Sequence, residues 1–522
     1  MRRPTRRLGG GLGGGLGMLC RDSGGPPHER SGFGGDARTD RPGPPPLTAR
    51  GRDVLFRATA GAGSLAILAA LAELPGANGP AEWRWAYRPI GLAPLWLPVL
   101  AALALLAVVR WRPPGLGGRL LLVALGVVFT LALNTAQPGG LGRVTASLVS
   151  RNSFSYLYDA ALAGSARDLL AGSPTAAGEL SLHSRTHPPG ALLAIRALDS
   201  IARRLGPPRG ALALGAAQAI ENEMNRARDR RRPVPAQAPS PWTPAALAFL
   251  LVLASALAAL PLYRLALAWG LSETAAGLAA ALWLAVPARS LFTPSLDQAL
   301  ALVPILATAL AAGPGRARAL AAGAVIALGC FTSYGLLGAL PLVMWIAATA
   351  PDGPEAPSGF ALRPRLVRAA ATGAGFLLPW LALALAGYPA WERFRDALAT
   401  HRSMAVATRS YPLWLAWNPY DFALLCGPAV VILAVAALFV FRRGALGRGL
   451  LGAAGLFLLL WLSGSVRGEV GRIWLFEMPF ACLGTAAAID RFWGADGGRA
   501  FSLLGLQALL ALALGASMIF VS

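Results

Sequence analysis

Two histidines four residues apart carry the clearest chemistry in this sequence. His183 and His187 flank Arg185 in the segment SLHSRTH, which is followed at once by Pro188 and Pro189. Imidazoles at this spacing can converge on one metal ion or one phosphate group. The prolines disfavour a continuous helix, because residues before proline are pushed toward extended conformations. We therefore predict a loop in which His183, Arg185 and His187 bind a substrate phosphate. Two alternatives are open: a divalent metal on His183 and His187, or a His187 ring that only hydrogen-bonds at the top of the next helix.

A carboxylate precedes these histidines in the same polar stretch. Asp159 follows Phe154, Tyr156 and Tyr158. Rings at a membrane surface partly remove water from a carboxylate, which suits it to general-base work. The alternative is a solvated aspartate on an amphipathic surface helix. From these residues alone both interpretations stay open.

A second charged segment lies late in the chain, between two apolar runs. The sequence SVRGEVGR contains Arg467, Glu469 and Arg472. Guanidinium groups bind phosphate through two parallel hydrogen bonds, so a phosphate is the expected ligand. Glu469 is predicted to belong to the same substrate site. Alternatively, it pairs with one arginine and leaves the other free.

Two further clusters hold candidate substrate-binding residues. Asp297 begins an apolar segment in TPSLDQ, where helix N-capping also accounts for a carboxylate. Arg409, Asn418 and Asp421 lie among four aromatic residues in RSYPLWLAWNPYD. Aromatic rings there are interface anchors or a platform on which a sugar stacks. We predict all four polar residues to contact substrate.

The composition places these residues in a membrane. The chain has 522 residues, of which 55% are hydrophobic and 14% charged, whereas soluble domains carry about 25% charged residues. Apolar runs long enough to be membrane-spanning helices recur almost to the end. We predict an all-α bundle of about 13–15 transmembrane helices. The expected spans are residues 53–74, 92–109, 119–135, 189–205, 243–262, 273–288, 297–312, 318–331, 334–350, 369–387, 415–440, 449–463, 473–489 and 500–521. Residues 210–223 are ambiguous: they either cross as a helix or, together with 189–205, lie along the interface.

The net charge of +22 does not indicate a nucleic-acid partner. All 47 basic residues are arginine, and they lie in the N-terminal region and in short loops between apolar runs, as the positive-inside rule expects. We predict residues 1–52 to be a disordered, Arg/Gly/Pro-rich cytoplasmic tail and 53–522 to be the membrane domain. The stretch 136–188 then becomes a large first extracytoplasmic loop with short interfacial helices. The other candidate residues fall on the same side, whereas the basic segment 226–232 breaks the rule there.

Four motifs resemble those of the GT-C superfamily of integral membrane glycosyltransferases, in particular the bacterial family-39-like group related to protein mannosyltransferases. They are HSRTHPPG, TPSLD, NPYDF and RGEVGRIWLFEMPF, within residues 119–490. The resemblance implies a polyprenyl-phosphate sugar donor and a lipid, glycan or protein acceptor outside the bacterial cytoplasmic membrane. It implies that Asp159 is the base, that His183 and His187 position the donor phosphate or a metal, and that Arg467 and Arg472 bind the phosphate. The family usually has an acidic pair soon after the preceding helix, whereas Asp159 is single and lies further downstream.

Three other functions remain open from the sequence. A transporter or flippase of lipid-linked or small substrates predicts ionisable residues in the middle of helices, whereas most here lie near helix ends. A ligase or polymerase of surface polysaccharide more often has its large loop late in the chain. A non-catalytic membrane scaffold is compatible with the missing acidic pair.

Overall fold

The computed structural model describes residues 47–89, 95–111, 115–163, 165–171, 180–350, 362–494 and 497–520. Within them the chain is almost entirely helical, which confirms the all-α class. The predicted disordered tail lies outside the described residues up to 46, and a helix already begins at Ala49. The two short strands, β1 (Ala86–Tyr87) and β2 (Met518–Ile519), pair antiparallel.

Six helices in the described ranges are long and apolar enough to cross a membrane, which supports a multi-pass membrane protein. They are α1 (Ala49–Leu71), α3 (Gly115–Thr135), the pair α11 (Trp242–Leu257) with α12 (Ala259–Ala268), α19 (Leu362–Leu385), α23 (Gly444–Ser463) and α26 (Gly497–Ser517). A seventh span would join α21 (Tyr411–Cys426) to α22 (Pro428–Val440) across a bend of 107°.

Several segments predicted to span are shorter helices in the structure. They are α2 (Trp96–Trp111), α13 (Glu273–Leu284), α15 (Leu296–Leu300) with α16 (Leu302–Ala312), α17 (Arg316–Cys330), η3 (Tyr334–Gly338) with α18 (Ala339–Thr349), and α25 (Met478–Trp493). At 1.5 Å per residue, a helix of 16 residues is about 24 Å long, less than the roughly 30 Å of a bilayer core. The described residues thus hold fewer full-length spans than the 13–15 predicted.

The candidate span 189–205 is not a helix of membrane length in the structure. It forms a 13-residue helix, α9 (Gly190–Ala202), and one 3₁₀ turn, η2 (Arg203–Leu205). Its polar residues make specific contacts: the Arg196 guanidinium donates to the Ala160 carbonyl at 2.9 Å, and Asp199 accepts from the Ser240 amide at 2.7 Å. The apolar face of α9 is long enough in sequence to resemble a membrane-spanning segment, although the helix also has a charged face.

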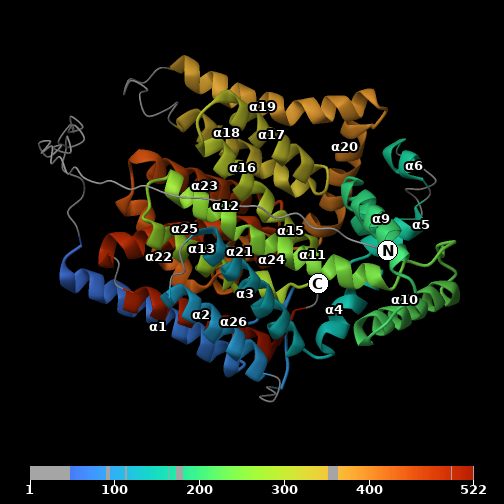
Figure 1. Cartoon of the computed structure of the whole chain (residues 1–522), viewed down its shortest axis with the longest axis horizontal. Coiled ribbons are helices and arrows are strands. Elements are labelled where there is room, and N and C mark those ends of the chain that lie inside the picture. Colours follow the sequence, from blue (N-terminus) through green and yellow to red (C-terminus); the bar gives the residue numbers. More distant parts are fainter. Residues whose placement is uncertain are drawn as a thin grey trace, which may run out of the picture. The chain divides into compact units, whose positions relative to one another are not determined.

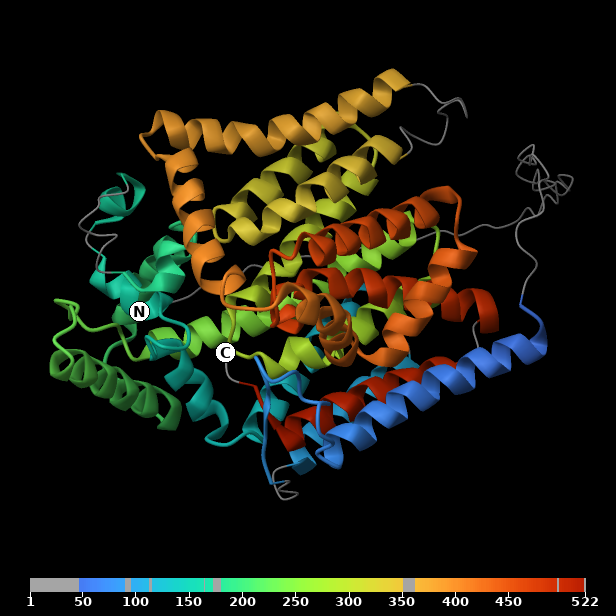
Figure 2. The same cartoon turned by 180° about the vertical axis from the view of Figure 1, so that it is seen from behind.

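Short helices between α3 and α11 form what we call the cap, residues 140–229. It comprises α4 (Gly140–Val149), α5 (Tyr156–Leu162), α6 (Ala166–Ala171), α8 (Leu182–Arg185), α9, η2 and α10 (Ala211–Asp229). Figures 1 and 2 show α4, α5, α6, α9 and α10 gathered at one end of the long helices. The cap has its own apolar core, which includes Leu148, Leu157 and Ile195.

The elements that complete this end of the bundle come from the second half of the chain. They are α14 (Pro287–Leu291), α20 (Ala390–His401), the π turn η4 (Arg402–Val406), α24 (Val470–Ile473) and η5 (Leu475–Glu477). Because these pieces are short, most of their backbone groups need partners outside a helix. Side chains provide many of those partners, as described below.

Helices α17 and α19 pack at backbone distance (Figure 1). A Cβ at Gly375 would lie 1.9 Å from the Leu320 carbonyl oxygen, and one at Gly323 would lie 1.9 Å from that of Thr372. Small residues allow such close approach between helices in membranes. At Gly373, on the same helix, an added Cβ would find its nearest neighbour at 3.8 Å.

We expect Gly375→Ala and Gly373→Ala to have opposite effects on stability. Alanine favours a helix over glycine by roughly 1 kcal/mol, so Gly373→Ala should raise the unfolding temperature slightly. Gly375→Ala should lower it by several degrees, because α17 and α19 must separate. Thermal unfolding of both purified variants in detergent measures this. Equal shifts for the two variants would contradict the packing described.

Candidate functional site

A cavity of about 550 Å³ lies where the cap meets the short elements of the second half of the chain. Six regions line it: residues 153–156, the segment around α8, the start of α15, η3, α20 with the turn after it, and the loop 465–476. Arg409 and Leu460 add to this lining. Residues far apart in sequence therefore share one space.

Asp159 fixes the histidine-bearing wall of this cavity from behind. Its carboxylate is fully buried and accepts hydrogen bonds from the backbone amide of Ser181, at 3.1 Å, and from the Ser181 hydroxyl. The Arg151 guanidinium lies 3.8 Å from its other oxygen. Ser181 is in turn the N-cap of α8. Asp159 is not among the residues that line the cavity, so its contacts make it a positioning residue for the histidine segment.

His183 and His187 both line the cavity. Nδ1 of His187 lies 2.9 Å from the His183 carbonyl oxygen, which can only accept, so Nδ1 carries the proton and Nε2 the lone pair. The Tyr156 ring packs edge-on against the His187 ring, with centroids 5.7 Å apart. Removal from water lowers the pKa of His187 to about 4. His187 is therefore a neutral imidazole at pH 7.

Asp297 also lines the cavity, in the first turn of α15. The N-cap of this helix is Ser295, not Asp297, and the Gln298 side chain accepts from the Ser295 amide at 3.2 Å. Ser295 and Gln298, rather than Asp297, therefore cap the N-terminus of α15. The Asp297 carboxylate instead faces Arg472, whose Nε lies 3.5 Å away.

Four charged side chains form a continuous ion chain along the cavity wall. Arg409 contacts Glu469 at 3.1 Å, Glu469 contacts Arg472 at 2.8 Å, and Arg472 contacts Asp297. Each side chain is partly shielded from water, at 17–30% exposure, so these pairs are screened less than surface pairs. The two positive and two negative charges of the chain balance.

Arg467 adds a positive charge to the same wall. Its guanidinium donates to three backbone carbonyls: Gly464 at 3.2 Å, Val406 at 2.6 Å and Arg409 at 2.5 Å. It also lies over the Tyr411 ring, 5.4 Å from the centroid. None of the ion pairs among the described residues joins it to a carboxylate. The cavity therefore carries one positive charge in excess.

Asn418 and Asp421 hold the loop that bears these charges. The Asn418 amide donates to the Val466 carbonyl at 2.8 Å and accepts from the Gly468 amide at 3.1 Å. Asp421 accepts from the Gly471 amide at 3.2 Å. Neither residue lines the cavity. In the structure they position Arg467, Glu469 and Arg472, and the stacked aromatic platform predicted around them does not face this space.

The remaining wall is apolar and aromatic. It is made by Tyr334, Leu337, Phe394, Leu398, Met404 and Leu460. Tyr334 contacts Phe394 edge-on at 5.3 Å, and its hydroxyl lies 3.4 Å from that of Tyr388. One cavity thus has a charged side and an apolar side.

Seven of the residues predicted to bind substrate line this one cavity: His183, His187, Asp297, Arg409, Arg467, Glu469 and Arg472. Arg185 lines a small adjoining pocket instead. Sequence reasoning missed the aromatic wall of Tyr334 and Phe394, because single rings in ordinary apolar sequence give no signal. His401 also lines the cavity and donates from Nε2 to the Ser465 carbonyl oxygen at 2.7 Å.

The two histidines do not extend to a larger set of metal donors. Among the described residues, no three His, Cys, Asp or Glu side chains are grouped so that they could hold a metal ion. The contacts found for His187 are those of a ring held by the backbone.

No protein-family model matches this chain, and no curated protein matches it in sequence.

We expect protonation of His187 to destabilise the protein. Its folded pKa lies below the ordinary value of about 6.5, so the neutral ring contributes stability above pH 6.5, and that contribution is lost as the pH falls toward 4. The unfolding temperature of the wild type should therefore fall more steeply between pH 6.5 and 4.5 than that of His187→Gln. Above pH 7 the two proteins should respond to pH alike. Parallel curves over the acidic range would contradict this account of His187.

Proposed function

We propose that this chain is a membrane glycosyltransferase that moves a sugar from a polyprenyl-phosphate donor to an acceptor hydroxyl. The observation that carries the proposal is one cavity with a cationic side and an apolar side, at one end of a bundle of membrane-length helices. Such a space suits an amphiphile whose head is an anion. The resemblance of four motifs to GT-C glycosyltransferases supports the same reading.

The charge of the cavity favours a phosphate over a neutral head group. Arg409, Arg467 and Arg472 face only Asp297 and Glu469, and His187 is neutral. A phosphate diester supplies the one negative charge that is lacking. Arg467 is best suited to bind it, because its other contacts are neutral carbonyls and a ring rather than competing carboxylates.

In this proposal Asp297 takes the proton from the acceptor hydroxyl. As the acceptor oxygen bonds to the anomeric carbon, the bond from that carbon to the phosphate oxygen breaks. The lipid phosphate leaves with the electron pair, and the guanidinium groups stabilise its charge. Asp297 is preferred to Asp159 because its carboxylate lines the cavity, whereas that of Asp159 is buried against Ser181.

The setting of this reaction follows from the same proposal. The cavity would open on the extracytoplasmic side of a bacterial cytoplasmic membrane, and the cap would be the first extracytoplasmic loop. The acceptor would be a lipid, glycan or protein of the cell envelope.

We expect Arg467→Gln to weaken donor use by at least tenfold, mainly through KM, because it removes the unpaired positive charge. The matched control is Arg402→Gln, since Arg402 is exposed, lies near the cavity and does not line it. The measurement is release of polyprenyl phosphate from a panel of radiolabelled donors by purified protein with envelope acceptors. No consumption of any donor by the wild type would reject the proposed function.

Asp297→Asn should lower kcat by 10² or more, as loss of a general base does, while leaving donor binding largely intact. Asp159→Asn should cost less than tenfold, because an amide oxygen still accepts both hydrogen bonds from Ser181. The same turnover assay, with donor binding measured separately, compares the two. The reverse order of effects would return the role of base to Asp159.

A further inference from the structure

A second cavity, of about 280 Å³, lies at the opposite end of α25 from the first. Phe476, just before α25, lines the first cavity, whereas Asp490, near the end of α25, lines the second. Fourteen residues separate Phe476 from Asp490, which corresponds to about 21 Å along a helix. Nothing in the proposed transfer reaction uses this second cavity.

Four charged groups surround it, contributed by four different helices. Arg110 is in the last turn of α2, Arg119 is near the start of α3, Glu273 is in the first turn of α13, and Asp490 is on α25. None of the ion pairs among the described residues joins these arginines to these carboxylates. The positive and negative groups are equal in number and are held apart.

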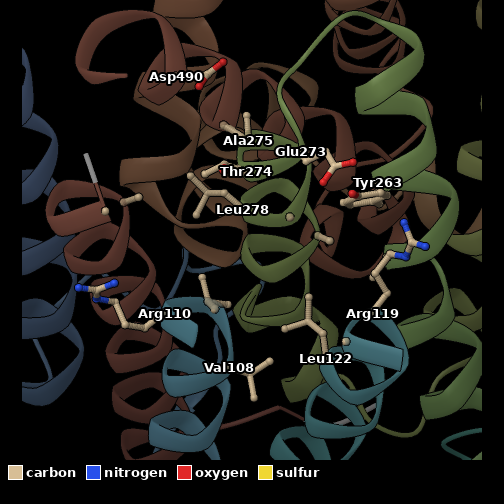
Figure 3. Close-up of a pocket in the computed structure, with 18 of the residues that line it drawn as sticks. Val108, Arg110, Arg119, Leu122, Tyr263, Glu273, Thr274, Ala275, Leu278 and Asp490 are labelled. Carbon is tan, nitrogen blue, oxygen red and sulfur yellow. The ribbon is translucent and has the colours of Figure 1, made fainter. Parts of the chain in front are cut away.

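The groups are arranged over an apolar floor. Figure 3 shows Arg110 and Arg119 on separate helices, with Leu278 between them in the view and Val108 and Leu122 below. Glu273 is drawn beside Tyr263, and Asp490 lies at the outer rim. Arg119 is oriented by the Tyr263 ring, 4.8 Å from its centroid, and Asp490 accepts from the Ser272 hydroxyl at 3.1 Å.

The helices around this cavity place it at the level of lipid head groups. Arg119 lies near the first residue of α3, which is long enough to span a membrane, and Tyr263 and Phe501 belong to two other candidate spans. A cavity near the end of spanning helices, with charged walls above an apolar floor, meets both the head group and the upper acyl chains of a lipid.

We propose that this cavity binds a zwitterionic phospholipid that carries a primary amine, of the phosphatidylethanolamine type. The phosphate is bound by Arg119, and the ammonium group donates to Glu273, which Figure 3 shows on the same side of the pocket as Arg119. Equal numbers of guanidinium and carboxylate groups favour a zwitterion over an anionic lipid. A primary ammonium can donate hydrogen bonds to a carboxylate, whereas a quaternary ammonium has no N–H to donate.

The test uses the full purified chain and three lipids with identical acyl chains: phosphatidylethanolamine, phosphatidylcholine and phosphatidylglycerol. Lipid retained per protein is measured by native mass spectrometry. We expect phosphatidylethanolamine to be retained at least tenfold more strongly than the other two. Glu273→Gln should reduce the retention of phosphatidylethanolamine to that of phosphatidylcholine, and Glu273→Asp should retain part of the difference. Arg119→Gln should weaken the retention of both phosphatidylethanolamine and phosphatidylcholine.

Two control variants remove the same charges, one positive and one negative, at residues that do not line the cavity. Arg264→Gln alters an exposed arginine next to Tyr263, and Glu221→Gln alters an exposed carboxylate in the cap. Neither should change lipid retention, and donor turnover should be unaffected by Glu273→Gln. Equal retention of the three lipids by the wild type, a preference for phosphatidylglycerol, or unchanged retention in both Glu273→Gln and Arg119→Gln would overturn the proposal.

Discussion

The ion chain from Arg409 through Glu469 and Arg472 to Asp297 is the interaction on which the larger cavity depends. It joins the segment before α21 and the loop before α24 to the start of α15. Charges that are partly removed from water are costly unless they are paired or hydrogen-bonded. Loss of Glu469 leaves Arg409 without its carboxylate, and loss of Arg472 leaves Asp297 without its guanidinium, so the two inner members set both the geometry of the wall and its charge.

The sequence was most informative where charge and hydropathy conflict. Arg467, Glu469 and Arg472 stand between apolar runs, and Asp297 begins one, so each needed a polar neighbour within an apolar setting. The structure brings these four residues together with both histidines. Helical class and membrane character followed from composition for the same reason, since long apolar runs allow few other structures.

Individual roles were harder to predict, because they depend on which way a side chain faces. Asp159, Asn418 and Asp421 are all polar residues among aromatic ones, as substrate-binding residues often are, but each bonds the backbone of a loop. Hydropathy also cannot separate a short amphipathic helix such as α9 from a crossing one. Its Arg196 and Asp199 bond to groups distant in the sequence, and only the fold reveals those partners.

The first residue of α9 has a mechanical consequence for the cavity. The Gly190 amide donates to the Phe331 carbonyl at 2.9 Å, and a Cβ on Gly190 would lie 2.2 Å from that oxygen. This backbone seam fastens the histidine segment to the end of α17, which is itself in backbone contact with α19. The histidine segment, α17 and α19 are therefore joined to one another through their backbones. The loop that carries Arg467 and Arg472 is held in place by side chains rather than by backbone contacts. We therefore expect a change in the width of the cavity to come from movement of this loop.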